Sequence, residues 1–185
     1  PKWARGYLRP ERVQLVEDAI RAAEARTSGE IVPMIVRRSS TIGHVPVIIA
    51  CLLLTLFIVA DGPGWQYELI GEHWAWYLVD TVVLLLLSGQ LARIPLLQRL
   101  LTTRDDQALQ VDMRSQIEFY RSNIHATSDA TGVLLLVSLM EHRAVVLADT
   151  SIDAKVSDET WDEVVGLTTE GIKNGNVGLG LAAAI

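Results

Sequence analysis

Two long apolar runs dominate the hydropathy pattern of this chain. The first run, Val45–Ala60, contains no charged residue, and the second run, Trp74–Gly89, contains only Asp80. Neither has the polar stripe that a helix on the surface of a soluble protein carries. Each approaches the roughly 20 apolar residues needed to cross about 30 Å of hydrocarbon. The pattern predicts a transmembrane hairpin of two helices, and two buried core helices are the alternative.

The residues around these runs favour the membrane interpretation. Aromatic residues, which settle at membrane interfaces, gather around the connecting segment Asp61–His73: they are Trp65, Tyr67, Trp74, Trp76 and Tyr77. Arginines precede the first run and follow the second, whereas the connecting segment has no Lys or Arg. Because positively charged flanks stay on the cytoplasmic side, the sequence predicts two spans with both termini in the cytoplasm and the connecting loop outside.

Asp80 is the one polar residue within the spans that calls for a functional interpretation. An ionisable side chain inside a membrane is costly and suggests function, such as contact with a partner protein. However, Asp80 lies only about six residues, roughly 9 Å, from the loop end of its helix. It could therefore reach interfacial water, or form a hydrogen bond with Thr55 of the other span.

Outside the hairpin, the pattern predicts helices and strands of a polar domain. Apolar residues recur at helical spacing from Pro10 to about Arg26. Glu30–Arg38 has the pattern of a strand, and Pro33, which cannot donate to a ladder, places it at an edge or a bulge. After the hairpin, Leu91–Leu101 is broken by Pro95 and two arginines and is predicted to be the interfacial exit of the second span.

The next segment, Asp105–Ile124, is predicted to be an amphipathic helix. Its apolar face is expected to consist of Leu109, Met113, Ile117, Tyr120 and Ile124, at steps of three and four. Its solvated face is expected to consist of Arg104, Asp112, Arg114, Glu118 and Arg121.

The clearest strand is Gly132–Met140, whose nearly continuous apolar sequence is typical of a strand covered on both faces. A tight connection leads to the strand Ala144–Asp149, so these two form an antiparallel hairpin. Glu30–Arg38 reaches Gly132–Met140 by a crossover that contains a helix, which makes that pair parallel. A helix from about Ser157 to Gly175 follows. Residues 1–40 and 103–185 therefore form one α/β domain with a small mixed sheet, interrupted by residues 41–102.

This topology brings three carboxylates to one edge of the sheet. Pairing of Val133 near Thr150 places Asp129 and Asp149 together, and the parallel strand adds Glu30. Three carboxylates with nearby hydroxyls and carbonyls could hold a hard cation such as Ca²⁺. The alternative is that these residues are caps and turn residues at strand ends.

Composition and motifs exclude some classes of function. The formal net charge of −6 argues against nucleic-acid binding, which needs clustered Lys and Arg. The single cysteine, Cys51, can form no internal disulfide. The sequence contains no GxSxG, HExxH, Walker or GxGxxG signature. The four histidines are scattered without the spacing of metal ligands, so the sequence predicts no catalytic residue.

The segments outside the hairpin resemble the TPM domain family. The resemblance is carried by TSGEIVPMIVRRS, by FYRSNIHATSDATGVLLLVSLMEHRAVVLADTSI and by the helix around Trp161. It covers about Glu11–Ser40 and Asp105–Ile185. It implies a three-layer α/β/α sandwich, divalent-metal binding, a weak acid phosphatase activity reported for plant members, and roles in maintaining membrane complexes. The acidic positions match the family pattern in part: Asp129 and Asp149 are carried over, and Glu30 more weakly.

Two functions follow as expectations. The first is a non-enzymatic, membrane-anchored TPM-like module that acts as an accessory subunit in the assembly, stability or repair of an integral membrane protein complex. The second is a metal-dependent acid phosphatase that works near the membrane surface. The expected partners are the lipid bilayer and the membrane complex.

Overall fold

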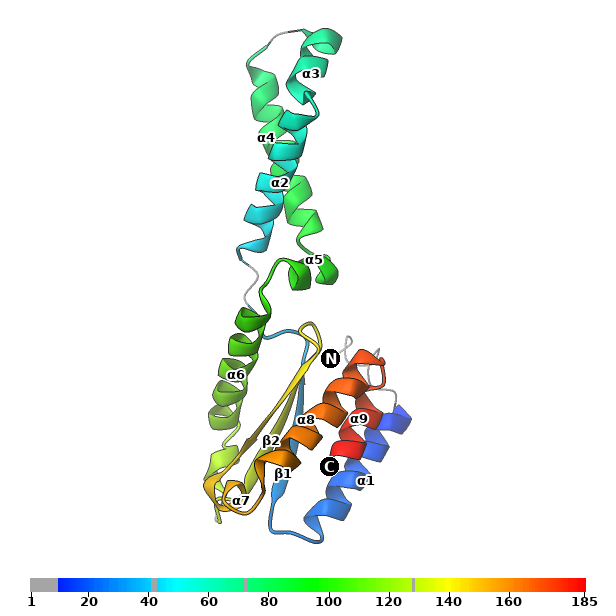
Figure 1. Ribbon diagram of the computed structural model, residues 1–185, viewed down its shortest axis with the longest axis vertical. Coiled ribbons are helices and arrows are strands. Elements are labelled where there is room, and N and C mark those ends of the chain that lie inside the picture. Colours follow the sequence, from blue (N-terminus) through cyan, green and yellow to red (C-terminus); the bar gives the residue numbers. More distant parts are fainter. Residues whose placement is uncertain (1–9, 41–42, 72, 128) are drawn as a thin grey trace. The chain divides into compact units, whose positions relative to one another are not determined.

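The computed structural model describes residues 10–40, 43–71, 73–127 and 129–185 (Figure 1). The chain divides into two compact units. The domain unit comprises Pro1–Ser40 and Gln107–Ile185, and the hairpin unit comprises Thr41–Asp106. These boundaries lie close to positions 41 and 102, where the hydropathy pattern predicts an insertion into one domain.

The domain unit is built on a small mixed sheet, as predicted. Its strands are β1 (Glu30–Val36), β2 (Gly132–Ser138) and β3 (Arg143–Ala148), in the spatial order β1-β2-β3. β1 pairs parallel to β2, and β2 pairs antiparallel to β3. Val133 lies opposite Ala148, two positions from the predicted partner. β1 is an edge strand, where the missing N–H of Pro33 leaves no ladder bond unmade.

Every residue of β2 is buried, because helices cover both faces of the sheet. Leu135 and Val137 point to one face and pack with α1 (Pro10–Glu24), α8 (Asp158–Lys173) and α9 (Val177–Ala184). The alternate residues Leu134 and Leu136 point to the other face and pack with α6 (Arg104–Arg121) and with Ile124 of the 3-10 helix η2 (Ile124–Ala126). Figure 1 shows α1, α8 and α9 together on one side of the sheet and α6 on the other.

Three glycines shape the pair of helices α8 and α9: Gly171 lies in α8, Gly175 lies in the connection, and Gly180 lies in α9. The backbone of Gly175 has φ 68°, and Gly175 and Asn176 donate their N–H groups to the carbonyls of Ile172 and Gly171. This is the Schellman arrangement, which favours glycine after the helix end. A Cβ at Gly171 would lie 2.6 Å from the Cα of Gly180, so the two helices cross with their backbones in contact.

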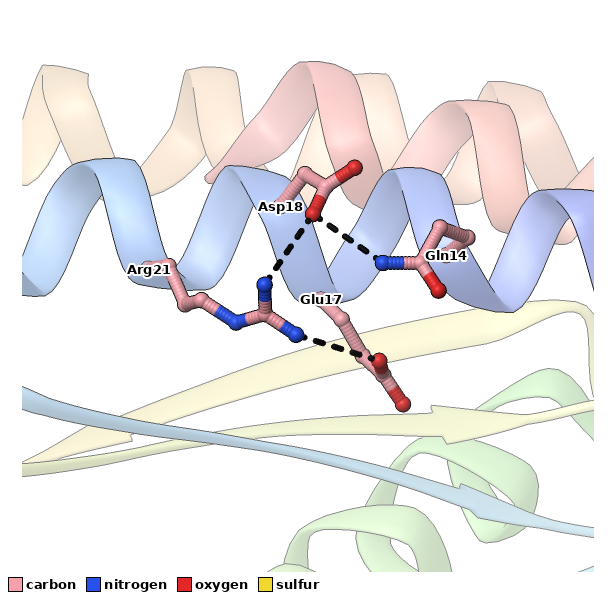
Figure 2. A network of polar contacts seen from close by, with 4 residues as sticks. All are labelled: Gln14, Glu17, Asp18 and Arg21. Carbon is pink, nitrogen blue, oxygen red and sulfur yellow. Dashed lines mark hydrogen bonds and ion pairs between the residues drawn. The ribbon is translucent and has the colours of Figure 1, made fainter.

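Helix α1 carries a polar network on its exposed side (Figure 2). Arg21 forms ion pairs with Glu17 at 3.6 Å and with Asp18 at 3.5 Å. The amide of Gln14 also donates to Asp18, at 3.1 Å. All partners belong to the same helix at spacings of three and four, so the network supports α1 locally, by a few tenths of a kcal/mol per pair.

The hairpin unit contains four helices among its described residues: α2 (Val45–Val59), α3 (Gly62–Ile70), α4 (Ala75–Leu91) and α5 (Pro95–Leu100). The helices α2 and α4 pack against each other and match the two predicted apolar runs (Figure 1). The predicted connecting loop instead contains α3, and the segment predicted to be the interfacial exit of the second span contains α5. A proline in the first turn starts both of these helices, where its missing N–H costs nothing.

The lengths of these helices bear on whether each could cross a membrane by itself. Among the described residues, no single helix is both long and apolar enough to cross a membrane. The pair α2 and α3, joined with a bend of 61°, passes the same criterion together by length and composition.

The orientation of α6 differs from the predicted one. Leu109, Met113, Ile117 and Tyr120 were expected to be buried, but all four are exposed. The helix instead buries Val111, Ser115, Glu118 and Phe119. Glu118 tolerates burial because Arg114 forms an ion pair with it at 2.5 Å. The helix has two apolar faces, and the smaller one fits against the sheet.

Candidate functional sites

The predicted acidic edge is the end of the sheet at which β1 and β2 begin and β3 ends. The N–H of Glu30 donates to the carbonyl of Thr131 at 3.1 Å, and the N–H of Asp149 donates to the carbonyl of Gly132 at 2.8 Å. These backbone bonds bring the starts of two strands and the end of the third to one edge, with Asp129 in the preceding turn. The topology that the sequence predicts for this edge is therefore present.

The carboxylates at this edge do not gather into a metal-binding group. Glu30 and Asp129 are exposed. Asp149 caps α7 (Thr150–Asp153), because its Oδ1 accepts from the N–H of Thr150 at 2.7 Å. Its Oδ2 is buried without a hydrogen-bond partner among the described residues. Within the described ranges, no three His, Cys, Asp or Glu side chains are placed to hold a metal ion. Capping explains Asp149, and Ca²⁺ binding stays a prediction.

Glu141, at the opposite edge of the sheet, has hydrogen-bond partners on both of its carboxylate oxygens. Its Oε1 accepts the N–H of Ser40 at 2.8 Å and the N–H of Ser39 at 3.1 Å. Its Oε2 accepts the hydroxyl of Ser138 at 2.5 Å, and that hydroxyl lies 2.9 Å from the hydroxyl of Ser39. Glu141 thus ties the exit of β1 to the end of β2. We call these four residues the Glu141 clamp.

The electrostatics of the clamp keep Glu141 ionised. Burial raises the pKa of the Glu141 carboxyl, but hydrogen bonds from the Ser138 hydroxyl and from the backbone N–H groups of Ser40 and Ser39 outweigh burial and hold that pKa below its ordinary value of 4.5. Glu141 has an exposed fraction of 3%. Because both carboxylate oxygens are occupied, the clamp positions the chain and offers no open ligand site.

The sequence does contain a signal for the clamp, which the motif search missed. Parallel strands end at the same edge of a sheet, so Ser39 and Ser40, which follow β1, come close to Ser138 at the end of β2 and to Glu141 just after it. An acid that follows a fully buried strand, opposite two small polar residues, satisfies the backbone N–H groups there. From the sequence, Glu141 was interpreted only as part of the tight connection between the two strands.

Asp80 forms a hydrogen bond with a residue that none of the sequence alternatives named. Its Oδ1 accepts the side-chain amide of Gln66, on α3, at 2.9 Å. Thr55, one of the alternatives, instead donates to the carbonyl of Cys51 within its own helix at 2.8 Å. The Oδ2 atom of Asp80 is buried and has no hydrogen-bond partner among the described residues. Asp80 therefore links α4 to α3 through one carboxylate oxygen, and its other oxygen accepts no hydrogen bond from the described residues.

The hairpin unit exposes most of its apolar side chains. Its buried centre is small and consists of Val45, Ile49 and Ala92, with Leu53, Leu91, Leu97 and Leu101 packed against them. The exposed apolar residues include Leu52, Leu54, Leu56, Ile58 and Val59 on α2, and Leu78, Val79, Val82, Val83, Leu85, Leu86 and Leu87 on α4. The two helices pack against each other, and many of their apolar side chains stay exposed.

Comparison with known proteins finds a similar fold in a solved structure. The sequence matches no family model and no curated protein. Among solved structures, it is similar to the NMR structure of the BA42 protein from the psychrophilic bacterium Bizionia argentinensis. The likeness has a TM-score of 0.53 at 20% identity and covers 96% of this chain and 75% of BA42. At this identity the likeness concerns the fold alone.

Proposed function

We propose that the chain is a membrane-anchored, TPM-like module that binds and supports a larger membrane protein complex and does not itself catalyse a reaction. In this proposal residues 41–102 are a two-helix transmembrane hairpin that interrupts a three-layer α/β/α sandwich. The observation that carries the proposal is the apolar surface of α2 and α4, which faces outward along both helices.

The energetic argument concerns the medium around these helices. Exposing apolar surface to water costs about 25 cal/mol per Å². Soluble monomers rarely expose contiguous apolar patches above a few hundred Å². The exposed fractions on α2 and α4 reach 78% at Val59 and 65% at Leu86, which is unfavourable in water and favourable in hydrocarbon. Lipid or an apolar protein partner would remove this cost.

The dimensions suit a hairpin with modest mismatch. α2 has 15 residues and α4 has 17, lengths that correspond to about 22 Å and 26 Å. A hydrocarbon thickness near 30 Å exceeds these lengths by about 8 Å and about 4 Å, which bilayer thinning and anchoring side chains accommodate. Trp65 and Tyr67 are exposed on α3 and are suited to such anchoring. The arginines at both outer flanks favour a cytoplasmic domain unit.

Carbonate extraction and cysteine labelling test the anchor and its orientation. In a Cys51→Ala background, a cysteine at the exposed Glu68 should react with an impermeant reagent from outside intact cells. A cysteine at Asp129 should react only after permeabilisation. The chain should stay with the membrane at alkaline pH. Release by carbonate, or the reverse labelling pattern, would contradict the proposal.

A second experiment separates support of a complex from catalysis. Purification in mild detergent should recover a defined membrane complex, and removal of the chain should lower the amount of that assembled complex. The purified chain should not hydrolyse a phosphomonoester above background. Hydrolysis that Asp149→Asn abolishes would instead favour the metal-dependent phosphatase.

A further inference from the structure

An apolar stripe runs along the exposed side of α6. It consists of Leu109, Met113, Ile117 and Tyr120, with exposed fractions of 53%, 49%, 58% and 62%. At 100° per residue these side chains fall within an arc of about 80° on the side away from Val111. The stripe is about 16 Å long, three turns of helix. A helix whose larger apolar face points away from its own core presents that face to another molecule.

Opposite charges lie at the two ends of the stripe. Asp106 is on the stripe side in the first turn, and Arg121 is in the last turn. Both side chains are exposed, and neither has an ion-pair partner among the residues that the structure describes. Whatever covers the stripe therefore meets a carboxylate at one end and a guanidinium at the other.

We propose that this stripe is the interface of a homodimer, in which α6 of one copy packs antiparallel against α6 of a second copy. The spacing of the stripe is nearly symmetric about its midpoint, near position 115. A two-fold axis there places Leu109 opposite Tyr120 of the other copy, and Met113 opposite Ile117. Such a self-complementary patch is what a two-fold interface requires.

The charges select the antiparallel arrangement. In it, Arg121 of one copy lies about 4 Å along the helix axis from Asp106 of the other, within reach of its long side chain. On the other flank Asp112 lies near Gln116 of the second copy, whose amide can donate to it. A parallel pair would instead set Asp106 against Asp106 and Arg121 against Arg121, which is repulsive.

The size of the interface determines its strength. A contact of three helical turns buries less than the roughly 1,200 Å² at the low end of stable interfaces. The dimer is therefore reversible, and its population depends on the concentration of the chain. This inference does not depend on the proposed function, because α6 exposes the stripe whatever surrounds the hairpin unit.

The first test measures self-association of the full chain in detergent by sedimentation equilibrium. The unmodified chain should show a monomer–dimer equilibrium. Met113→Glu should raise the dimer dissociation constant at least about tenfold, because it buries a carboxylate among apolar side chains. Leu15→Glu is the matched control, since Leu15 is similarly exposed on α1, at 47%, and should leave the equilibrium unchanged. A monomeric chain, or a dimer that Met113→Glu leaves intact, would overturn the proposal.

A charge exchange tests the ends of the interface. Asp106→Arg and Arg121→Asp should each weaken the dimer, because each sets like charges together. The double variant should restore it. Both residues are exposed, so folding should be unaffected, and circular dichroism checks this. Double and single variants of equal affinity would contradict the antiparallel register.

Cysteine cross-linking tests the direction of the helices. In a Cys51→Ala background, a mixture of Leu109→Cys and Tyr120→Cys chains should form a disulfide between the two kinds of chain. Leu109→Cys alone should not, because its two copies lie about 17 Å apart along the axis, beyond disulfide reach. Efficient cross-linking of Leu109→Cys with itself would show a parallel pair and refute the proposal.

Discussion

At the scale of single residues, Glu141 shows how a buried charge can organise a loop. Its carboxylate receives three hydrogen bonds, from Ser39, Ser40 and Ser138. Buried backbone N–H groups need an acceptor, and two of these groups lie just beyond the end of β1. The Glu141 carboxylate therefore accepts hydrogen bonds from backbone N–H groups that lie outside any strand or helix.

Removing this acceptor should destabilise the domain unit. Glu141→Ala leaves the N–H groups of Ser39 and Ser40 without their acceptor, whereas the Ser138 hydroxyl can still donate to the Ser39 hydroxyl. Each unsatisfied group costs about 1–3 kcal/mol. We expect a loss of about 3 kcal/mol in the free energy of unfolding after partial rescue by water. Urea denaturation measures it. Glu163→Ala, at an exposed position of α8, is the control and should change stability by less than about 0.5 kcal/mol.

The same carboxyl should make stability depend on pH. Its pKa in the folded protein lies below the ordinary value of 4.5, so folding favours the ionised form. The resulting stabilisation is complete above the unfolded pKa and is lost as the pH falls through the folded pKa. The unfolding free energies of the unmodified chain and Glu141→Gln should therefore converge below about pH 4.5. A difference that stays constant from pH 7 to pH 3 would contradict this assignment.

Single residues were also the hardest feature to predict. The sequence places Glu30 and Asp149 at one edge correctly, because strand order follows from hydrophobicity and crossover handedness. It does not show that Asp149 turns its Oδ1 onto the N–H of Thr150. Local capping competes with ion binding for the same oxygen, and only side-chain geometry decides between them.

At the scale of elements, α6 shows the limit of hydrophobic periodicity. Its sequence places Leu109, Met113 and Ile117 on one face, and Val111 and Phe119 on the other. Periodicity identified the helix and its larger apolar face, but the smaller face with Val111 and Phe119 was missed, and periodicity alone does not say which face meets the sheet. The strands were predicted more reliably, because β2 is apolar on both sides and leaves no choice of face.

The crossing of α8 and α9 gives a prediction about an element pair. Gly180→Ala would place a Cβ 2.8 Å from the Cα of Gly171 and 3.0 Å from the carbonyl oxygen of Leu167. Neither contact can be relieved by a side-chain rotation, so the helices must separate. We expect a loss of about 1–3 kcal/mol, measured by urea denaturation.

A matched control lies on α8 itself. Gly166 has no atom within 4 Å of an added Cβ. Gly166→Ala should therefore stabilise the chain by up to about 1 kcal/mol, because alanine is the better helix former. Equal effects of the two substitutions would show that the close approach at Gly180 does not limit packing.

At the scale of the whole molecule, the domain unit is assembled from two distant pieces of chain. α1 and β1 come from the first piece, and the other two strands come from the second. β1 supplies the parallel partner of β2, and Val16 of α1 packs in the core with Leu135 and Val137. Neither piece has a complete core of its own.

This arrangement predicts that the hairpin unit can be removed. Replacing residues 41–102 by a Gly/Ser linker of about 12 residues, with a mean span of about 20 Å, should give a soluble chain that unfolds in one cooperative transition. Thermal and urea unfolding should coincide. The control is the fragment Asp105–Ile185, which lacks α1 and β1 and should be far less stable. A fragment as stable as the joined domain would contradict the assembly from two pieces.

The pairing of Glu30 with Gly132 also sets the order of events while the chain is being made. About a hundred residues separate the two positions, so at about 5–20 residues per second β1 leaves the ribosome some 5–20 s before its partner strand exists. The contacts between α2 and α4 join segments much closer in sequence and are complete sooner. In a nascent chain halted after α5, we thus expect the hairpin to be formed. The residues that precede the hairpin should still be unfolded, because the other strands of their sheet have not been made.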